Sequence, residues 1–242
     1  MIRHAAFALI LVGLFQGDGV RGDDPPSRPF EPTDRYETRQ VEGWTVLVHK
    51  GLLDDQPELA ERTLTLLKFQ LYQVARRLPP AVVAKIRTIK IWVEANEPHH
   101  PGMAYHPDPG WLKRHGMNPD KAKCVEIANA TNFLAWSFDQ PWMVFHELAH
   151  GYHDQFLPDG FGNTDVKAAY DHAMAAGQYK SVLRAGGREE KAYAATNPME
   201  YFAEASEAYF GTNDFYPFVR PELKRHDPRL FGLLGKLWAD QP

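Results

Sequence analysis

A regular pattern of hydrophobic positions runs from Pro57 to Leu78. Apolar side chains recur there every three to four residues, at Ala60, Leu64, Leu67, Leu71, Val74 or Ala75, and Leu78. This period places the apolar residues on one face of an α-helix and the polar residues on the other. We therefore predict an amphipathic helix over this stretch, ended by the two prolines that follow it.

Alternation of apolar and polar residues marks shorter stretches and is typical of β-strands. One such stretch runs from Val41 to His49 and a second from Ile86 to Ala95. A third short run, Cys124–Asn129, also favours a strand. We expect this third strand to lie at the edge of a sheet, where an extended peptide could pair with it.

The second half of the chain shows mainly helical patterns. Helices are predicted over Thr164–Ala176 and from Asn197 to Tyr209 or Phe210, and one or two more over Tyr216–Trp238. Between the first two, Tyr179–Leu183 favours a short extended piece followed by a glycine turn. Strands in the first half and helices in the second predict an α+β fold with a small mixed sheet.

The segment from residue 96 to residue 122 is rich in proline, glycine and histidine. Its histidines are His99, His100, His106 and His115. A segment this long is more than a simple connector. It could form a lid or wall over a cleft, or a solvated surface loop, and the sequence leaves both interpretations open.

The N-terminus differs from the rest of the chain. A short basic start, an apolar run and a small-residue cleavage pattern predict a secretory signal peptide over residues 1–22. Residues 23–40 are rich in proline and polar residues, so we expect a flexible lead-in. We expect residues 41–242 to form a single domain. The expected location is outside the cytoplasm, secreted or periplasmic.

Composition narrows the possible partners. The 242 residues are 44% hydrophobic, enough for a sizeable core. The formal net charge is -4 and there is no basic run, which argues against nucleic acid as a partner. No apolar run reaches the length of a membrane span. The single cysteine, Cys124, cannot form an internal disulfide and is expected to be a buried structural residue.

The candidate chemistry centres on the stretch from Pro141 to His153, which contains the motif His146-Glu147-x-x-His150. In a helix, residues four apart leave the same face, so both imidazoles could bind one Zn²⁺ ion. Glu147 lies beside the first ligand, where it could take a proton from a water molecule at the metal. The motif has only three fixed positions and will occur by chance in unrelated chains. A metal site is therefore indicated only if the sequence also offers a third ligand.

Several residues compete for the role of third ligand. An extended motif with glycine at position 153 and histidine at position 156 is excluded, because those residues are His153 and Phe156. His153 is one turn beyond His150 but converges poorly with it on a tetrahedral ion, so we expect it near the ligands or at the cleft rim. Glu200 is favoured, because its helix is mostly apolar and a buried carboxylate requires a partner. The alternative is that Glu200 only completes a capping box with Asn197.

Together the two motifs resemble those of the gluzincin metallopeptidases of the anthrax lethal factor and Pro-Pro endopeptidase type. The resemblance covers roughly residues 140–211, in which Tyr193 precedes Glu200 by seven residues. The segment Asn197–Phe210 is also similar to the Mlc titration factor A peptidases.

This resemblance implies a zincin-like domain in which one helix carries the paired histidines and a following helix carries the ligand glutamate. It implies zinc as the cofactor and a peptide or protein as the substrate. The implied roles are metal ligation by His146, His150 and Glu200, general-base catalysis by Glu147, and transition-state hydrogen bonding by Tyr193. Glu204, one turn past Glu200, is expected to hold a ligand histidine through its other ring nitrogen. The alternatives are a non-catalytic zinc-containing binding protein and a zinc hydrolase of non-protein amides such as cell-wall peptides.

Overall fold

The computed structural model describes residues 30–239, and its first strands form a β-hairpin after a short 3₁₀ turn, Thr33–Arg35. Strand β1 (Tyr36–Val41) pairs antiparallel with β2 (Trp44–His49). Glu42 and Gly43 form the two-residue turn with φ values of 51° and 88°, as a tight hairpin requires. The prediction of a flexible lead-in through residue 40 is therefore wrong from Tyr36 onward. The hydrophobic pattern does not predict this strand, because most of its side chains are polar and at least partly exposed.

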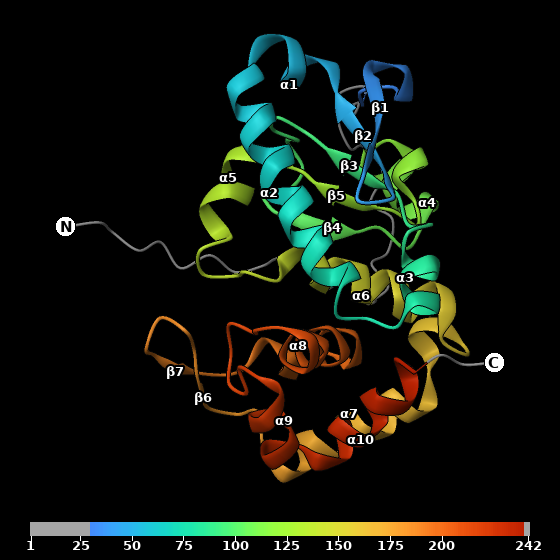
Figure 1. The fold of residues 1–242 in the computed structure, drawn as a ribbon. Helices are drawn as coiled ribbons and strands as arrows, with labels where there is room; N and C mark the ends of the chain where they lie inside the picture. Colours follow the sequence, from blue (N-terminus) through green and yellow to red (C-terminus); the bar gives the residue numbers. More distant parts are fainter. Residues whose placement is uncertain (1–29, 240–242) are drawn as a thin grey trace, which may run out of the picture.

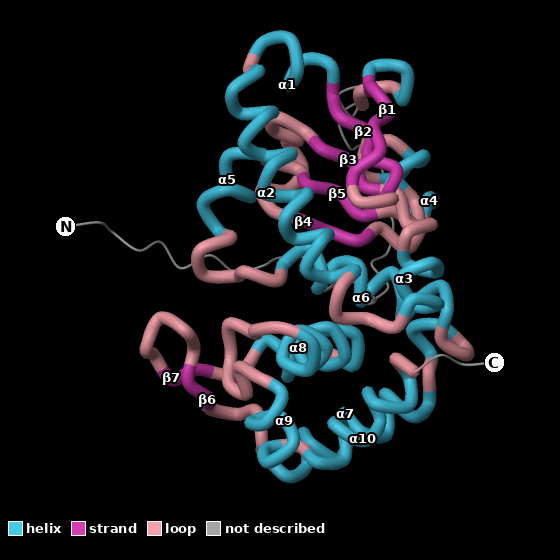
Figure 2. The backbone as a smooth tube through the Cα atoms, in the orientation of Figure 1, coloured by secondary structure: helices cyan, strands magenta, loops and turns pink. Residues whose placement is uncertain are grey.

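Five strands form a mixed sheet in the order β1-β2-β3-β5-β4 (Figures 1 and 2). Strand β3 (Ile91–Val93) is parallel to both β2 and β5 (Val125–Ile127). Strand β4 (Met103–Tyr105) pairs antiparallel with β5 and forms the edge of the sheet. The prediction of an edge strand at Cys124–Asn129 is wrong, because β5 is shorter and β4 covers its outer side. All three residues of β5 are buried, as in an interior strand.

Helices α1 (Lys50–Asp55), α2 (Pro57–Ala75), α3 (Pro80–Ile86) and α5 (Ala130–Trp136) accompany the sheet (Figure 1). Helix α2 confirms the predicted amphipathic helix and ends three residues before the predicted Leu78. Helix α3 was not predicted. Its last residue, Ile86, was expected to begin a strand that the structure starts only at Ile91.

The histidine-rich segment, residues 96–122, is not a fully solvated loop, and Met103 within it lines the cavity described below. It contains strand β4, helix α4 (Pro109–Arg114) and the 3₁₀ turn Pro119–Lys121. His100 and His106 are buried, whereas His99 and His115 are exposed. The segment therefore belongs partly to the sheet and partly to the surface.

The second half is mostly helical and lies below the sheet in Figure 1. Its elements are α6 (Met143–Phe156), the 3₁₀ turn Gly160–Gly162, α7 (Thr164–Ala176), β6 (Val182–Leu183), β7 (Glu189–Glu190), the 3₁₀ turn Tyr193–Ala195, α8 (Pro198–Phe210), α9 (Arg220–His226) and α10 (Pro228–Leu237). The predicted bounds of α7 are confirmed, and those of α8 agree to within a residue. The mixed α+β fold with a small mixed sheet is thus confirmed.

Helix α6 lies between the two halves and contacts β4 on one side and α8 on the other. Gly151 permits the close approach to the sheet, because a Cβ atom there would lie 2.6 Å from the Ile89 side chain and 3.2 Å from the Tyr105 ring. Eleven consecutive residues of α6, from Met143 to His153, are buried. Anything carried on this helix is therefore held rigidly inside the molecule.

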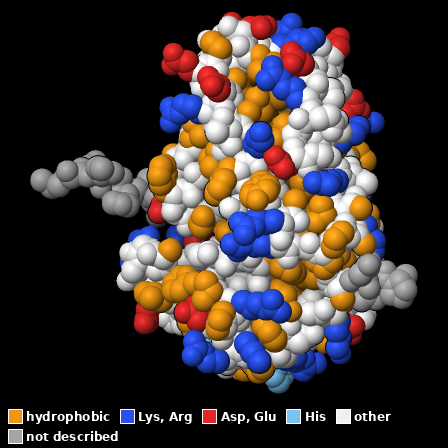
Figure 3. All heavy atoms as spheres, viewed as in Figure 1, with side chains coloured by type: hydrophobic (Ala, Val, Ile, Leu, Met, Phe, Trp, Pro, Cys, Tyr) orange, Lys and Arg blue, Asp and Glu red, His pale blue; other side chains and the backbone are white. Residues whose placement is uncertain are grey.

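The predicted signal peptide, residues 1–22, lies outside the described residues. Among the described helices, none has the length and apolar character needed to cross a membrane. On the face shown in Figure 3, basic side chains are separated by acidic, apolar and uncoloured surface.

Candidate metal and catalytic site

Helices α6 and α8 bring two histidines and one glutamate together. The Nε2 atoms of His146 and His150 lie 3.1 Å apart, and they lie 3.0 and 3.2 Å from Oε2 of Glu200. Ligands about 2.0–2.1 Å from a tetrahedral zinc ion are separated by about 3.3 Å. The three atoms therefore form a nearly equilateral triangle of about the size that one zinc ion requires. All three residues are buried, with 4%, 2% and 1% of their surface exposed.

The contacts of Glu200 separate the ligand interpretation from the capping interpretation. The side chain of Asn197 caps α8, because its Oδ1 accepts hydrogen bonds of 2.9 Å from the backbone N–H groups of Met199 and Glu200. The carboxylate of Glu200 instead faces the two histidines and Tyr193. Burial alone would raise the pKa of Glu200, but His150 and His146 outweigh it and lower that pKa to about 2.

Glu147 follows His146 on α6 and lines a cavity of about 320 Å³ together with His146 and Tyr193. Its Oε2 accepts a hydrogen bond of 2.8 Å from the backbone N–H of Tyr105 in strand β4. The edge strand thus fixes the orientation of this carboxylate. A carboxylate held at the wall of a cavity beside possible metal ligands is placed to accept a proton.

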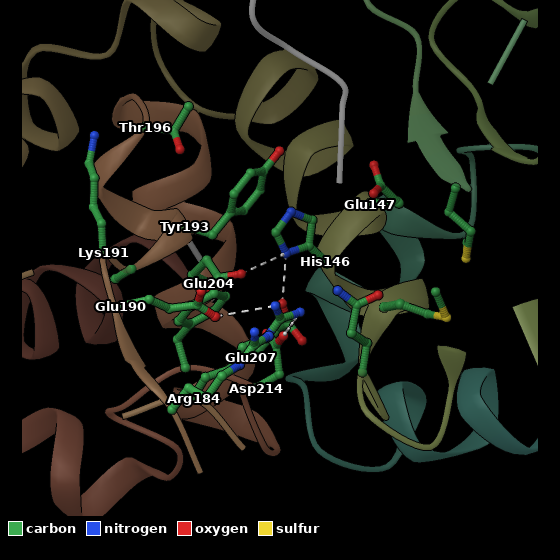
Figure 4. A pocket seen from close by; sticks show the side chains of 16 residues that line it. His146, Glu147, Arg184, Glu190, Lys191, Tyr193, Thr196, Glu204, Glu207 and Asp214 are labelled. Carbon is green, nitrogen blue, oxygen red and sulfur yellow. Dashed lines mark hydrogen bonds and ion pairs between the residues drawn. The ribbon is translucent and has the colours of Figure 1, made fainter. Parts of the chain in front are cut away.

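Tyr193 approaches the same group from the 3₁₀ turn that precedes α8. Its hydroxyl lies 3.3 Å from Oε1 of Glu200 and donates to it. Glu147 and Tyr193 flank His146 in the view of Figure 4. Burial, and then the charges of Glu200 and Glu147, raise the pKa of Tyr193, so its phenol stays protonated as a hydrogen-bond donor at neutral pH.

The second ring nitrogen of His146 is held by a residue that the sequence did not single out. Its Nδ1–H donates to Oε1 of Glu207 at 2.6 Å, whereas Oε1 of Glu204 is 3.9 Å away. Glu204 was the residue predicted to hold a ligand histidine. The available signal was the spacing of Glu200, Glu204 and Glu207 along one helix, which marks both residues as candidates without choosing between them.

Three buried carboxyl groups, those of Glu204, Glu207 and Asp214, line the cavity beside His146. Burial raises the pKa of Glu207 to about 7, although the hydrogen bond to His146 opposes this. Burial and the neighbouring charges of Asp214 and Glu207 raise the pKa of Glu204, which also accepts a 3.0 Å hydrogen bond from Asn213. Arg184 lies 3.4 Å from Asp214 and offsets part of this negative charge. The group is therefore short of positive charge in the absence of a cation.

His153 lies away from the cavity. It is 0% exposed and packs against the rings of Phe202 and Phe161, with centroids 4.8 and 5.2 Å away. Neither ring nitrogen has a hydrogen-bond partner among residues 30–239. Burial, and then the charge of His150, lower the pKa of His153 to about 3. The structure thus places His153 in an aromatic pocket rather than at a cleft rim.

The far wall of the cavity comes from the β6–β7 hairpin and the residues that follow it. This wall is lined by Arg184, Arg188, Glu190 and Lys191, three of which are labelled in Figure 4. Arg184 is held by Glu190 at 3.3 Å. The glycine turn was predicted from the sequence, but neither strand β7 nor a role for these side chains was.

Comparisons with known proteins give limited information. No family model matches the sequence, and no curated protein matches it. Among solved structures, the chain is similar to the Pro-Pro endopeptidase from Paenibacillus alvei, with 16% sequence identity and a TM-score of 0.44. The match covers 82% of this chain and 99% of that chain. A likeness at this level assigns no role to any residue, so the chemistry of the site rests on its own geometry.

The residues present fit a zinc ion. Two imidazoles and one carboxylate are the donor set of many catalytic zinc sites, which keep a fourth position open. Here the cavity lies beside the ligands, and Glu207 supplies the acceptor that ligating histidines usually have on their second nitrogen. The Nδ1 atom of His150 has no such partner among the described residues.

Proposed function

We propose that the protein is an exported zinc-dependent metallopeptidase of the gluzincin type. The observation that carries this proposal is the triangle of His146, His150 and Glu200 beside a cavity that Glu147 also lines. A purely structural metal site gains nothing from a carboxylate base at the wall of an adjoining cavity. Export rests on the signal-peptide pattern of residues 1–22.

Each residue has a defined task in this proposal. A zinc ion held by His146, His150 and Glu200 would polarise the substrate carbonyl and bring the pKa of a bound water to about 7. Glu147 accepts the proton of the attacking water and passes it to the leaving amine. Tyr193 donates a hydrogen bond to the oxyanion that develops on the substrate carbonyl. Glu207 fixes the tautomer and orientation of the His146 ring.

The choice of a peptide as substrate is supported by strand β4. This strand is the edge of the sheet, and Met103 in it lines the cavity. An extended peptide can lengthen a sheet at its edge, and its side chains then enter neighbouring pockets at alternate positions. The backbone of β4 also contacts Glu147, which would bring such a peptide next to the proposed base.

Incubation of the purified protein with a diverse peptide library, followed by mass spectrometry of the products, tests this function. We expect cleavage that a zinc chelator abolishes and added zinc restores. Cleavage that persists at full rate in the chelator would exclude the zinc mechanism. A zinc-loaded protein that cuts no peptide would favour a binding protein, whereas cleavage only of cell-wall peptides would indicate a hydrolase of non-protein amides.

A further inference from the structure

A second set of two histidines and one glutamate lies at β4 and β5. His100 lies in the loop between β3 and β4, His106 directly follows β4, and Glu126 is the middle residue of β5. Both Nε2 atoms approach the same carboxylate oxygen, Oε2 of Glu126, at 3.0 and 2.7 Å. The three side chains are 6%, 2% and 0% exposed. Candidate ligand atoms on the three residues lie within 4.8 Å of one another.

The surroundings of this set carry an excess of negative charge. Three carboxylates, Glu94, Glu97 and Glu126, lie close together and are largely buried. Within residues 30–239 their ion pairs join them to one lysine, Lys121, and to histidines. Lys121 lies 2.7 Å from Glu94, and it also contacts Oε1 of Glu126. Three carboxylates and one ammonium group leave a formal charge of two negative units, which a divalent cation would neutralise.

Buried carboxylates that lack enough positive charge either take up protons or bind cations. Lys121 contacts Oε1 of Glu126 and leaves Oε2 to the two histidines, so both Nε2 atoms approach one carboxylate oxygen.

We propose that His100, His106 and Glu126 bind a second divalent transition-metal ion, of which Zn²⁺ is the best match to the donor set. Two nitrogens and one oxygen suit zinc better than the oxygen-binding cations magnesium and calcium. The burial of all three residues favours a structural role for this site. The ion would fasten the loop before β4 and the end of β4 to β5, and thereby brace the strand whose backbone orients Glu147.

The competing arrangement contains no metal and has two neutral imidazoles donating N–H groups to Glu126. The variant His106→Gln distinguishes the metal-bound arrangement from the metal-free one, because glutamine keeps an N–H donor but is a poor zinc ligand. The matched control is His115→Gln, the same change at an exposed histidine stacked on Trp111. The double variant His146→Ala/His150→Ala removes the first set and leaves this one intact.

Metal content of the full-length purified proteins, measured by mass spectrometry after equilibration with zinc, gives the test. We expect two zinc ions per chain in the wild type and in His115→Gln, and one in His106→Gln. Equal zinc content in the wild type and His106→Gln would overturn the proposal. A wild type with one ion and a His106→Gln protein with none would support this site while refuting zinc at His146, so the two proposals fail separately.

If His106→Gln does not fold, cobalt supplies a second measurement. Titration of the His146→Ala/His150→Ala protein with Co²⁺ should give visible absorption bands that saturate at one equivalent. A protein that shows no such bands would overturn the proposal.

Discussion

The chain buries the same three side-chain types in two places, and the two places are built differently. His146, His150 and Glu200 are joined across two packed helices, whereas the second set is carried by strands and a loop of the sheet. In each set two Nε2 atoms face one glutamate oxygen. The second oxygen of Glu200 faces the hydroxyl of Tyr193, whereas that of Glu126 contacts the ammonium group of Lys121.

This difference decides what each set can do. The first set adjoins a cavity that contains Glu147, a proton acceptor, and Tyr193, a donor for developing negative charge. At the second set the nearest additional group is the ammonium group of Lys121, and none of the three residues lines the cavity. A donor set of two histidines and one glutamate therefore defines a possible metal site, and its neighbours define whether catalysis is possible there.

The largest expected effect follows from breaking the first set with His150→Ala. This change removes one of three ligand atoms, so the protein should lose the zinc ion of this set and all peptide hydrolysis above background. The control His153→Leu should keep both, because His153 makes no polar contact among the described residues. Replacing an unsatisfied buried imidazole with an apolar side chain should also leave thermal stability equal or higher. Zinc loss in His153→Leu would instead make His153 a ligand.

The next largest effect is expected from Glu147→Gln, which removes the proton acceptor that distinguishes the first set. The amide oxygen of the introduced glutamine could still accept the hydrogen bond from the backbone N–H of Tyr105, so folding and zinc content should stay near wild type. Turnover should fall by about 10²–10⁴-fold, as is typical for loss of a general base. Steady-state kinetics on a cleaved library peptide, with zinc measured in the same samples, checks this. Unchanged turnover would remove Glu147 from the mechanism.

The elements that carry the first set could be predicted because their signals are local. The spacing of His146 and His150 within one helix fixes their common face, and Asn197 with Pro198 marks the start of α8. The choice between Glu204 and Glu207 could not be made in this way. It depends on how α8 crosses α6, which places Glu207 at 2.6 Å from His146 Nδ1 and Glu204 at 3.9 Å.

The second set gave no comparable local signal. His100 and His106 were visible as histidines in a polar segment, but Glu126 looked like one polar position in a short strand. Only the pairing of β4 with β5 brings them together, with Ala104 opposite Glu126. Such pairing between separate strands cannot be read from periodicity, which also explains why β5 was expected at the edge of the sheet.

A smaller effect is expected from Tyr193→Phe, which tests the proposed hydrogen-bond donor at the cavity beside the first set. The change removes one hydroxyl and leaves the ring in place against His146. Loss of one oxyanion donor should lower kcat by about 10²–10³-fold with little change in zinc content. A fall in zinc affinity with unchanged kcat would show instead that Tyr193 acts only by orienting Glu200, to which its hydroxyl donates.

The smallest of these effects should come from Glu207→Gln, which alters the support of a ligand and leaves the three ligands themselves unchanged. Loss of the charge that faces His146 Nδ1–H should weaken zinc binding by about 10–100-fold, as for other residues that orient ligating histidines. Glu204→Gln is the matched control, because Glu204 lies 3.9 Å from the same nitrogen and should matter less. Competition with a chelator measures both affinities. Activity of Glu207→Gln should return at saturating zinc, because in this proposal Glu207 acts through the orientation of His146. If zinc affinity falls more in Glu204→Gln than in Glu207→Gln, then Glu204 is the residue that positions His146.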